Sequence, residues 1–300
     1  MISQRENIST KEEDAHWGEP LLLSISHLTR YTYEGPVQDS FNEARLHPIS
    51  DSLQECSEFA LHLDPSTSVR DYPDFYSNCI QYFDIPQPHE SLEIKAISIV
   101  QTTPDTRGEI PSVGPETLEE PSVKENHFDF LHSSEFVSLE TDVWREAVDA
   151  LPSGLHDVWK DTVAIGEYIH RNYKYTPLST NVNTRAVEVV KKKQGVCQDF
   201  AHLMLGLCRI HGIPARYVSG YFLNQHKLPG EIEASHAWIE VFIPGFGWKA
   251  YDPTHRRETD TRYVKLAIGR DYFDTRPVGG TFRGRGTRKM VVEVSVQRIG

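Results

Sequence analysis

The sequence lacks the features of a secreted or membrane-bound protein. Four cysteines are scattered over 300 residues, too few for a disulfide scaffold. Cys56 and Cys79 can be small packing residues, or a single bridge could join them. The first twenty residues contain no apolar stretch typical of a secretory signal, and no later segment approaches the ~20 apolar residues that cross a bilayer. We therefore expect a cytoplasmic protein.

Positive charge is also scarce. The formal net charge is -12, whereas nucleic acids and anionic membranes bind clustered lysines and arginines. The densest basic stretch, residues 283–289, is short and interrupted by glycines. We therefore expect neither nucleic acid nor membrane as a partner. No loop of alternating acidic ligands for calcium is recognisable, and we expect no metal or cofactor.

The pattern of residues divides the chain into four parts. Residues 1–20 read as a polar tail. Residues 21–103 contain short runs of β-branched and aromatic residues separated by Pro, Asp, Asn and Gly, which predicts an antiparallel β domain. Residues 104–126 hold four prolines and six acidic residues with few large apolar ones, which predicts a surface linker or long loop. Residues 127–300 form the remaining part, a mixed core.

Within this core the apolar period changes to that of helices. Helices are predicted over about 141–151, 156–172 and 185–193, and a further helix begins at Cys197 and must end before Pro214. Strands follow at YVSGYF, ASHAWIEVFI and WKAYD, and KMVVEVSVQRI is predicted to close the core as its C-terminal strand. Helices followed by strands without regular alternation indicate an α+β fold with an antiparallel sheet.

Three residues of the core have the chemistry of a thiol nucleophile and its helpers. Cys197 stands behind a glycine at a predicted helix start, where the helix dipole favours the thiolate. His236 opens SHAWIEVF and Asp252 ends WKAYD. Together they can serve as the nucleophile, the general base and the carboxylate that orients the base. The charge of Asp199 opposes a thiolate at Cys197, so activation must depend on the helix terminus and on His236.

The pairing of the two strands tests this triad. With a four-residue loop and simple pairing, Asp252 falls opposite Ile239, on the wrong face for His236. A one-residue change brings Asp252 opposite Trp238, a diagonal neighbour of His236 at roughly 7 to 8 Å. The triad therefore predicts a bulge or a shifted register near the turn at residues 244–247.

Other interpretations compete with catalysis. A cysteine near a helix, a histidine entering a strand and an aspartate before proline are each commonly structural. A zinc site in the Cys197 helix cannot include both Cys197 and Cys208, because eleven residues of helix separate them by about 16 Å. The same separation forbids a disulfide between them. A redox-sensing thiol would need a resolving cysteine close to Cys197, and the sequence offers none.

The strings GVCQDFAHLMLGLCRIHGIPARYVSGYF and ASHAWIEVFIPGFGWKAYDPT resemble the core of the papain-related transglutaminase-like superfamily. The upstream string HLTRYTYEGPVQDSFNEARLHP resembles the N-terminal β region of bacterial members, and AIGRDYFDTRPVGGTFRG resembles their closing segment. The resemblance covers about residues 22–299. It implies a transglutaminase-like core behind an N-terminal β domain.

The resemblance also implies roles for single residues. Cys197 would be the nucleophile, His236 the general base and acid, and Asp252 the orienting carboxylate. Tyr175 is a candidate second oxyanion donor by position, with packing as a core aromatic as its alternative. His255 stands where bacterial relatives often have asparagine, and its role is open.

The reaction implied is acyl transfer from a peptide or carboxamide bond through a thioester. Hydrolysis is favoured, because the bacterial relatives are generally described as proteases, so we expect a cysteine protease or amidase acting on a peptide or protein. The alternatives are a transglutaminase, which transfers the acyl group to an amine, and a non-catalytic binding module on the same fold. An intact triad argues against the binding module.

Overall fold

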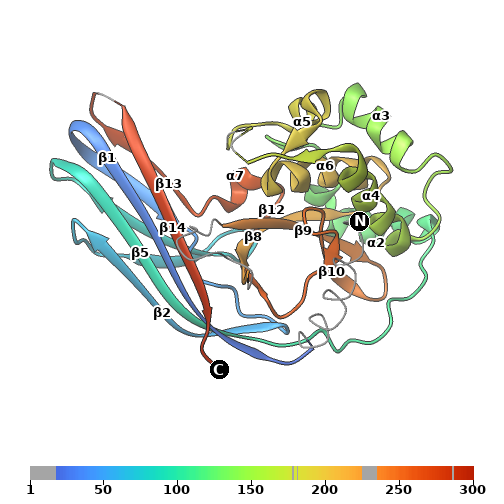
Figure 1. Ribbon diagram of the computed structural model, residues 1–300, viewed down its shortest axis with the longest axis horizontal. Coiled ribbons are helices and arrows are strands. Elements are labelled where there is room, and N and C mark those ends of the chain that lie inside the picture. Colours follow the sequence, from blue (N-terminus) through green and yellow to red (C-terminus); the bar gives the residue numbers. More distant parts are fainter. Residues whose placement is uncertain (1–17, 178, 181, 225–234, 286) are drawn as a thin grey trace, which may run out of the picture.

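The computed structural model describes residues 18–300 except 178, 181, 225–234 and 286. Two antiparallel sheets pack together, and helices cover the outer face of the second sheet (Figure 1). The mixed fold with an N-terminal antiparallel sheet agrees with the predicted α+β class. Most of the predicted polar tail lies outside the described residues. Among those described, no helix has the length and hydropathy needed to span a bilayer.

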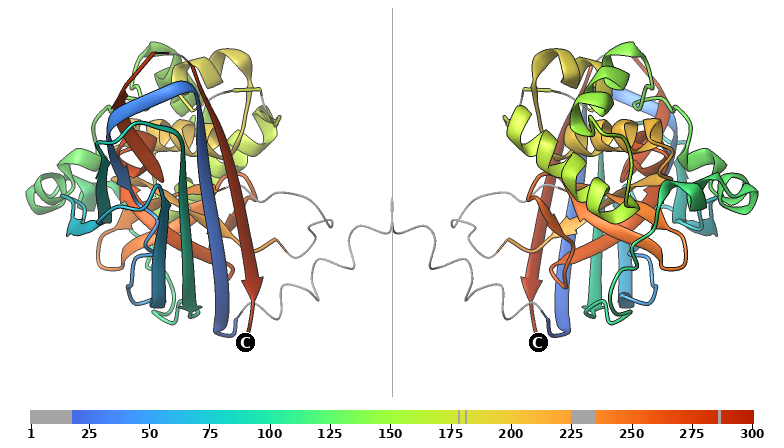
Figure 2. Two further views of the ribbon diagram at one scale, coloured as in Figure 1. Left: turned by 90° about the vertical axis from the view of Figure 1, so that its left-hand side faces the viewer. Right: turned by 90° about the vertical axis from the view of Figure 1, so that its right-hand side faces the viewer.

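The first sheet is organised around one long strand. Its strands are β1 (Leu21–Ala44), β2 (Gln54–Asp64), β3 (Arg70–Pro73), β4 (Cys79–Ile85), β5 (His89–Thr102), β13 (Val278–Arg283) and β14 (Arg288–Arg298). The first half of β1 pairs with β5 and β14, and the second half pairs with β4 and β13. Figure 2 shows β1, β5 and β14 running side by side in one layer.

The C-terminal strand lies in this first sheet, which differs from the prediction that it closes the core. β14 pairs with β1 in continuous register from Leu23 opposite Arg298 to Tyr33 opposite Arg288. The alternation of valines in β14 predicts a strand with one buried face, but any sheet with a free edge can accept such a strand. Val294 and Val296 fill the interface between the two sheets.

The second sheet carries the residues of interest. Its strands are β8 (Ala215–Phe222), β9 (His236–Ile243), β10 (Gly247–Asp252), β11 (Arg257–Glu258) and β12 (Tyr263–Gly269), in the order β11-β10-β9-β8-β12. One face packs on the first sheet, where Tyr221 and Leu266 meet Leu23 and Ile25. The side chains of Ile239 and Val241 point to the other face and join the core beneath the helices.

The helices match the predicted ranges within a few residues. They are α3 (Thr141–Ala150), α4 (Val158–Asn172), α5 (Ala186–Lys192) and α6 (Cys197–Ile210). The short α7 (Tyr272–Thr275) was not predicted. Asp157 caps α4 by accepting hydrogen bonds from the backbone N–H groups of Trp159 and Lys160. Arg185 is the N-cap of α5, and Lys193 ends that helix with a left-handed backbone. A two-stranded parallel sheet, β6 (Lys174–Tyr175) with β7 (Gln194–Gly195), precedes α6.

The segment expected as a linker is partly helical. It contains η2 (Pro115–Glu119) and α2 (Pro121–Asn126), and η3 (Phe128–Phe130) follows it. Two of the four prolines that indicated a loop, Pro115 and Pro121, occupy first-turn positions, where the missing N–H costs nothing. Val113, Leu118 and Val123 are buried in the core beneath the helices. The segment is therefore part of that core, although its composition is that of a linker.

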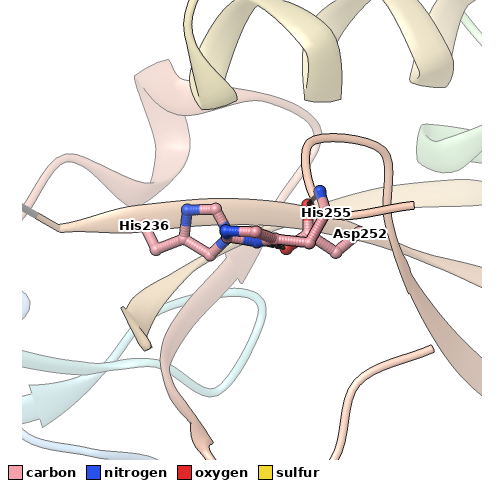
Figure 3. Close-up of side chains that lie close together, drawn as sticks. All are labelled: His236, Asp252 and His255. Carbon is pink, nitrogen blue, oxygen red and sulfur yellow. Dashed lines mark hydrogen bonds and ion pairs between the residues drawn. The ribbon is translucent and has the colours of Figure 1, made fainter. Parts of the chain in front are cut away.

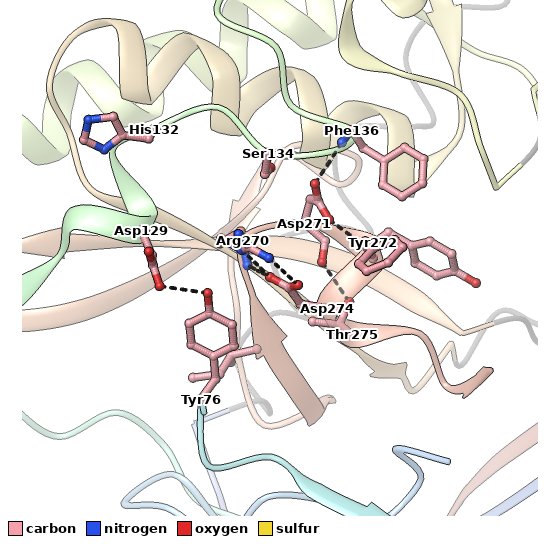
Figure 4. Close-up of polar contacts among 12 residues, drawn as sticks. Tyr76, Asp129, His132, Ser134, Phe136, Arg270, Asp271, Tyr272, Asp274 and Thr275 are labelled. Carbon is pink, nitrogen blue, oxygen red and sulfur yellow. Dashed lines mark hydrogen bonds and ion pairs between the residues drawn. The ribbon is translucent and has the colours of Figure 1, made fainter. Parts of the chain in front are cut away.

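Polar contacts anchor the C-terminal end of α6 to the strands around it. The buried guanidinium of Arg209 donates to the carbonyls of Ala215, Arg270 and His132. Next to it, Asp271 accepts a hydrogen bond from the backbone N–H of Phe136 at 2.8 Å (Figure 4). These contacts fix one end of α6, so its first residue also has a defined place.

Candidate active site

Cys197 is the first residue of α6, and its neighbours determine how that helix starts. Val196 precedes the helix with extended backbone angles, φ -113° and ψ -177°. The carboxylate of Asp199 accepts a hydrogen bond from the backbone N–H of Val196 at 2.8 Å. Gly195 makes room for this contact, because a Cβ there would lie 2.6 Å from the Cβ of Asp199. Cys197 is therefore held at the positive end of the helix dipole.

His236 and Asp252 lie together at the ends of β9 and β10. His236 Nε2 donates a hydrogen bond to Asp252 Oδ2 at 2.7 Å (Figure 3). The side chain of Asp252 is fully buried and that of His236 is 10% exposed. Because an ionised carboxylate only accepts hydrogen bonds, the proton must be on Nε2. The other ring nitrogen, Nδ1, is thus left for a second partner.

The thiol of Cys197 is that second partner. Burial by itself lowers the pKa of His236, but the charge and hydrogen bond of Asp252, with the hydrogen bond to Cys197, raise it to about 10. Burial likewise acts to raise the pKa of Asp252, but His236 and His255 hold it well below its usual range. The raised pKa of His236 and the lowered pKa of Asp252 both indicate a site that stabilises a protonated imidazole beside an ionised carboxylate.

The register of the hairpin brings Asp252 to the correct face. Residues 239–243 of β9 pair without interruption with residues 247–251 of β10. Because Ile243 pairs with Gly247, the loop between the strands is one residue shorter than the expected four-residue loop. Within this loop, Gly245 has a positive φ of 79°. Asp252 consequently follows opposite Trp238. The expected shift of register is present, and it arises from the shorter loop without a bulge.

Asp252 also binds two side chains that the sequence analysis did not assign to the site. Its Oδ2 accepts hydrogen bonds from His255 Nδ1 at 2.7 Å and from the Tyr263 hydroxyl at 2.8 Å. Its Oδ1 accepts from the backbone N–H groups of Thr254 and His255 at 2.8 and 3.3 Å. The string DPTH contained a signal for His255, since an aspartate before proline begins a turn that folds back on it. Tyr263 comes from β12 and had no local signal.

Asp199, two residues after the thiol, is a buried and hydrogen-bonded acid. Its side chain is fully buried, and burial raises its pKa despite hydrogen bonds from Thr180 and from the N–H of Val196. A raised pKa favours the neutral acid over the anion.

Tyr175 lies beside the candidate site and is not a core aromatic. Its strand pairs with Gly195, two residues before the thiol. Its side chain is 48% exposed, and its ring meets that of Phe200 edge-on with 6.1 Å between centroids. Burial, with the nearby charges of Cys197 and Asp252, raises the pKa of its hydroxyl to about 12, so the hydroxyl remains a hydrogen-bond donor.

One group of side chains has the donor atoms of a metal site within the residues that the structure describes. The ligand atoms of His236, Asp252 and His255 all lie within 4.8 Å of one another. Their hydrogen bonds to each other account for this arrangement without an ion. In α6, the ring of His202 accepts a hydrogen bond from the backbone N–H of Tyr272. Cys208 is buried, and that burial raises its pKa to about 12.

Comparisons with known proteins agree with this architecture. The family model for the transglutaminase-like superfamily matches residues 146–253, and that for the bacterial transglutaminase-like N-terminal region matches residues 23–101. An uncharacterized protein of Mycobacterium leprae is 34% identical over 283 residues, which cover 92% of this chain and 99% of that protein. A protein-glutamine gamma-glutamyltransferase of Pseudomonas aeruginosa is 34% identical over 95 residues, 29% of this chain and 14% of that enzyme.

A solved structure shares nearly the whole fold. The crystal structure titled as a "putative cysteine protease" from Cytophaga hutchinsonii aligns with a TM-score of 0.75 and 23% identity, covering 94% of this chain and 92% of that one. The N-terminal model covers nearly all of β1 to β5, and the other model covers residues 146–253, which contain Cys197, His236 and Asp252. The chain belongs to the transglutaminase-like superfamily, with the bacterial N-terminal region preceding its core.

Proposed function

We propose that this protein is a cysteine-dependent acyl-transfer enzyme that hydrolyses a peptide or carboxamide bond. The observation that carries the proposal is the chain of contacts from Cys197, at the start of α6, through His236 to the buried carboxylate of Asp252. This chain supplies a nucleophile, a proton carrier and a fixed counter-charge in one place.

The reaction follows from these positions. The Cys197 thiolate attacks the carbonyl carbon, and the protonated His236 gives its Nδ1 proton to the departing amine or ammonia, which leaves a thioester. Water then attacks the thioester while His236 takes its proton, and the thiolate leaves with formation of a carboxylic acid. Asp252 keeps Nε2 protonated throughout, so that Nδ1 is the nitrogen that faces the sulfur.

The negative oxygen of the tetrahedral intermediates needs hydrogen-bond donors. The backbone N–H of Cys197 belongs to the first turn of α6, where N–H groups have no acceptor within the helix. We propose it as one donor and the Tyr175 hydroxyl as the second, because the strand of Tyr175 pairs with Gly195, two residues before Cys197.

Hydrolysis is the first proposal because solvent reaches the residues around the thiol. The side chains of Tyr175 and His255 are 48% and 36% exposed. An amine must outcompete water at such a site. Transamidation is the second candidate. The P. aeruginosa protein that matches 29% of this chain is named a protein-glutamine gamma-glutamyltransferase. We also propose a peptide or protein as the substrate and the cytoplasm as the location.

Alkylation of the thiols tests the proposal without a known substrate. Cys56 and Cys79 are free and partly buried, and burial raises the pKa of each, so they provide internal controls. We expect iodoacetamide to modify Cys197 at pH 6, as measured by peptide mass spectrometry, and the controls to react only at higher pH. The variant His236→Ala should lose the reactivity at low pH. If Cys197 titrates like the other two thiols in both proteins, the proposal is wrong.

A second assay separates the two acyl acceptors. Glutamine-containing peptides are incubated with the protein, with and without a primary amine, and ammonia and products are measured. Ammonia or peptide cleavage without an amine indicates hydrolysis, whereas an amine-linked product indicates transamidation. Cys197→Ser is the control, because its hydroxyl has a similar size but is a far weaker nucleophile at neutral pH.

A further inference from the structure

Two imidazole rings share a single carboxylate oxygen at this site. His236 Nε2 and His255 Nδ1 each lie 2.7 Å from Asp252 Oδ2. The centroids of the two rings are 5.1 Å apart, and Figure 3 shows both rings directed at Asp252. The His236 side chain is 10% exposed, whereas that of His255 is 36% exposed. His255 can therefore exchange protons with solvent more readily than the ring that contacts the thiol.

The surroundings hold both rings in place. The ring of Phe222 lies 4.7 Å from that of His255 and 5.8 Å from that of His236, measured between centroids. The titratable groups at His255 are Asp252 on β10, which it contacts, and His236 on β9, whose ring lies beside it. Tyr263 on β12 and the backbone of Arg257 on β11 are neighbours of the same Asp252. Arg262 pairs with Asp260. Asp252 is the anion that both imidazoles contact.

We propose that His255 is a positioning residue that competes with His236 for the charge of Asp252, and so controls how far the Cys197–His236 pair is ionised. The inference rests on the proposed function. When His255 is neutral, its Nδ1–H donates to Asp252 and helps to fix the carboxylate, whose full negative charge supports a protonated His236. When His255 takes up a proton, two cations share that one anion.

The size of the competition follows from the distance. The centroids of the His236 and His255 rings are 5.1 Å apart. At this distance and an effective dielectric constant of about 20, repulsion between two protonated rings would change the ionisation equilibrium of the Cys197–His236 pair by more than about a hundredfold. Solvent at the exposed edge of His255 weakens this repulsion, so we expect a factor of about ten. The proton then returns from His236 to the sulfur, and the fraction of reactive thiolate falls.

The test compares wild type with His255→Asn. An asparagine amide can still donate to Asp252 but takes up no proton between pH 5.5 and 7.5, where imidazoles ordinarily do. Alkylation of Cys197 by iodoacetamide is followed by peptide mapping over this range. We expect the wild-type rate to fall about tenfold more than the variant rate as the pH is lowered. His255→Gln is a second variant if the asparagine protein folds poorly.

A control and a clear contradiction complete the experiment. His62→Asn removes an exposed histidine of β2 in the other sheet and should leave the profile unchanged. Superimposable profiles for wild type and for a folded His255 variant overturn the inference. This outcome is distinct from failure of the proposed function, in which His236→Ala also leaves the low-pH reactivity of Cys197 unchanged.

Discussion

Replacement of Asp252 by asparagine tests the centre of the site, because the side chains have the same shape but different hydrogen-bonding capacity. Five donors converge on the two carboxylate oxygens: three side chains on Oδ2 and two backbone N–H groups on Oδ1. An amide has one acceptor oxygen and one NH2 group. In either orientation its NH2 group faces other donors inside the protein.

The structure sets the magnitudes for Asp252→Asn. A buried donor without an acceptor costs about 1 to 3 kcal/mol, so we expect the free energy of unfolding to fall by about 3 kcal/mol. Loss of the negative charge also destabilises a protonated His236. A unit charge pair at about 4 Å and an effective dielectric constant of about 20 interacts by about 4 kcal/mol. That energy corresponds to about a thousandfold lower rate of Cys197 alkylation at pH 6.

Two measurements separate these effects. Urea unfolding gives the stability, and the rate of Cys197 alkylation at pH 6 reports the thiolate. Asp271→Asn is the matched control, since Asp271 is also buried and accepts from the N–H groups of Phe136 and Phe273. The control should lose stability but keep the reactivity of Cys197. If Asp252→Asn alkylates with the wild-type pH profile, the role given to the carboxylate is wrong.

Three further predictions concern single positions. Gly195→Ala places a Cβ 2.6 Å from the side chain that caps α6, so unfolding by urea should show a loss of about 2 kcal/mol, whereas Gly279→Ala, with open space, should lose less. Burial lowers the pKa of His27 from 6.5 to about 4. As the pH falls, His27 of the unfolded chain is therefore protonated before His27 of the folded protein. The free energy of unfolding should keep its full value above pH 6.5 and fall by up to about 3 kcal/mol between pH 6.5 and pH 4. A pH series of unfolding curves should show a smaller loss in His27→Leu. Tyr263→Phe removes one donor to the shared carboxylate. It should lower the rate of Cys197 alkylation at pH 6 about three- to tenfold, with little change in stability by urea unfolding.

Local signals in the sequence located most of the site. The glycine before Cys197 and the apolar period behind it predicted the start of α6. The requirement that Asp252 reach the face of His236 predicted the shifted register of the hairpin, which the structure contains. Both inferences depend on residues close in sequence, where geometry restricts the possible arrangements.

Features that depend on distant partners were not predictable in this way. The valine alternation of β14 marks a strand but does not specify that β1 is its neighbour. Pro115 and Pro121 start helices because the apolar residues around them find a core to pack against, which composition cannot reveal. Tyr263 reaches Asp252 from the opposite edge of the second sheet, through the fold alone.

The ionisation of Cys197 is the measurement that tests the central claim most directly. The difference in ultraviolet absorbance between wild type and Cys197→Ser isolates the thiolate of this residue, and it can be followed from pH 4 to 9. We predict a thiolate signal at pH 6, where a free thiol is almost fully protonated, and loss of that signal in His236→Ala. A thiolate signal that appears only above pH 8, in the wild type as well as in His236→Ala, would contradict the account.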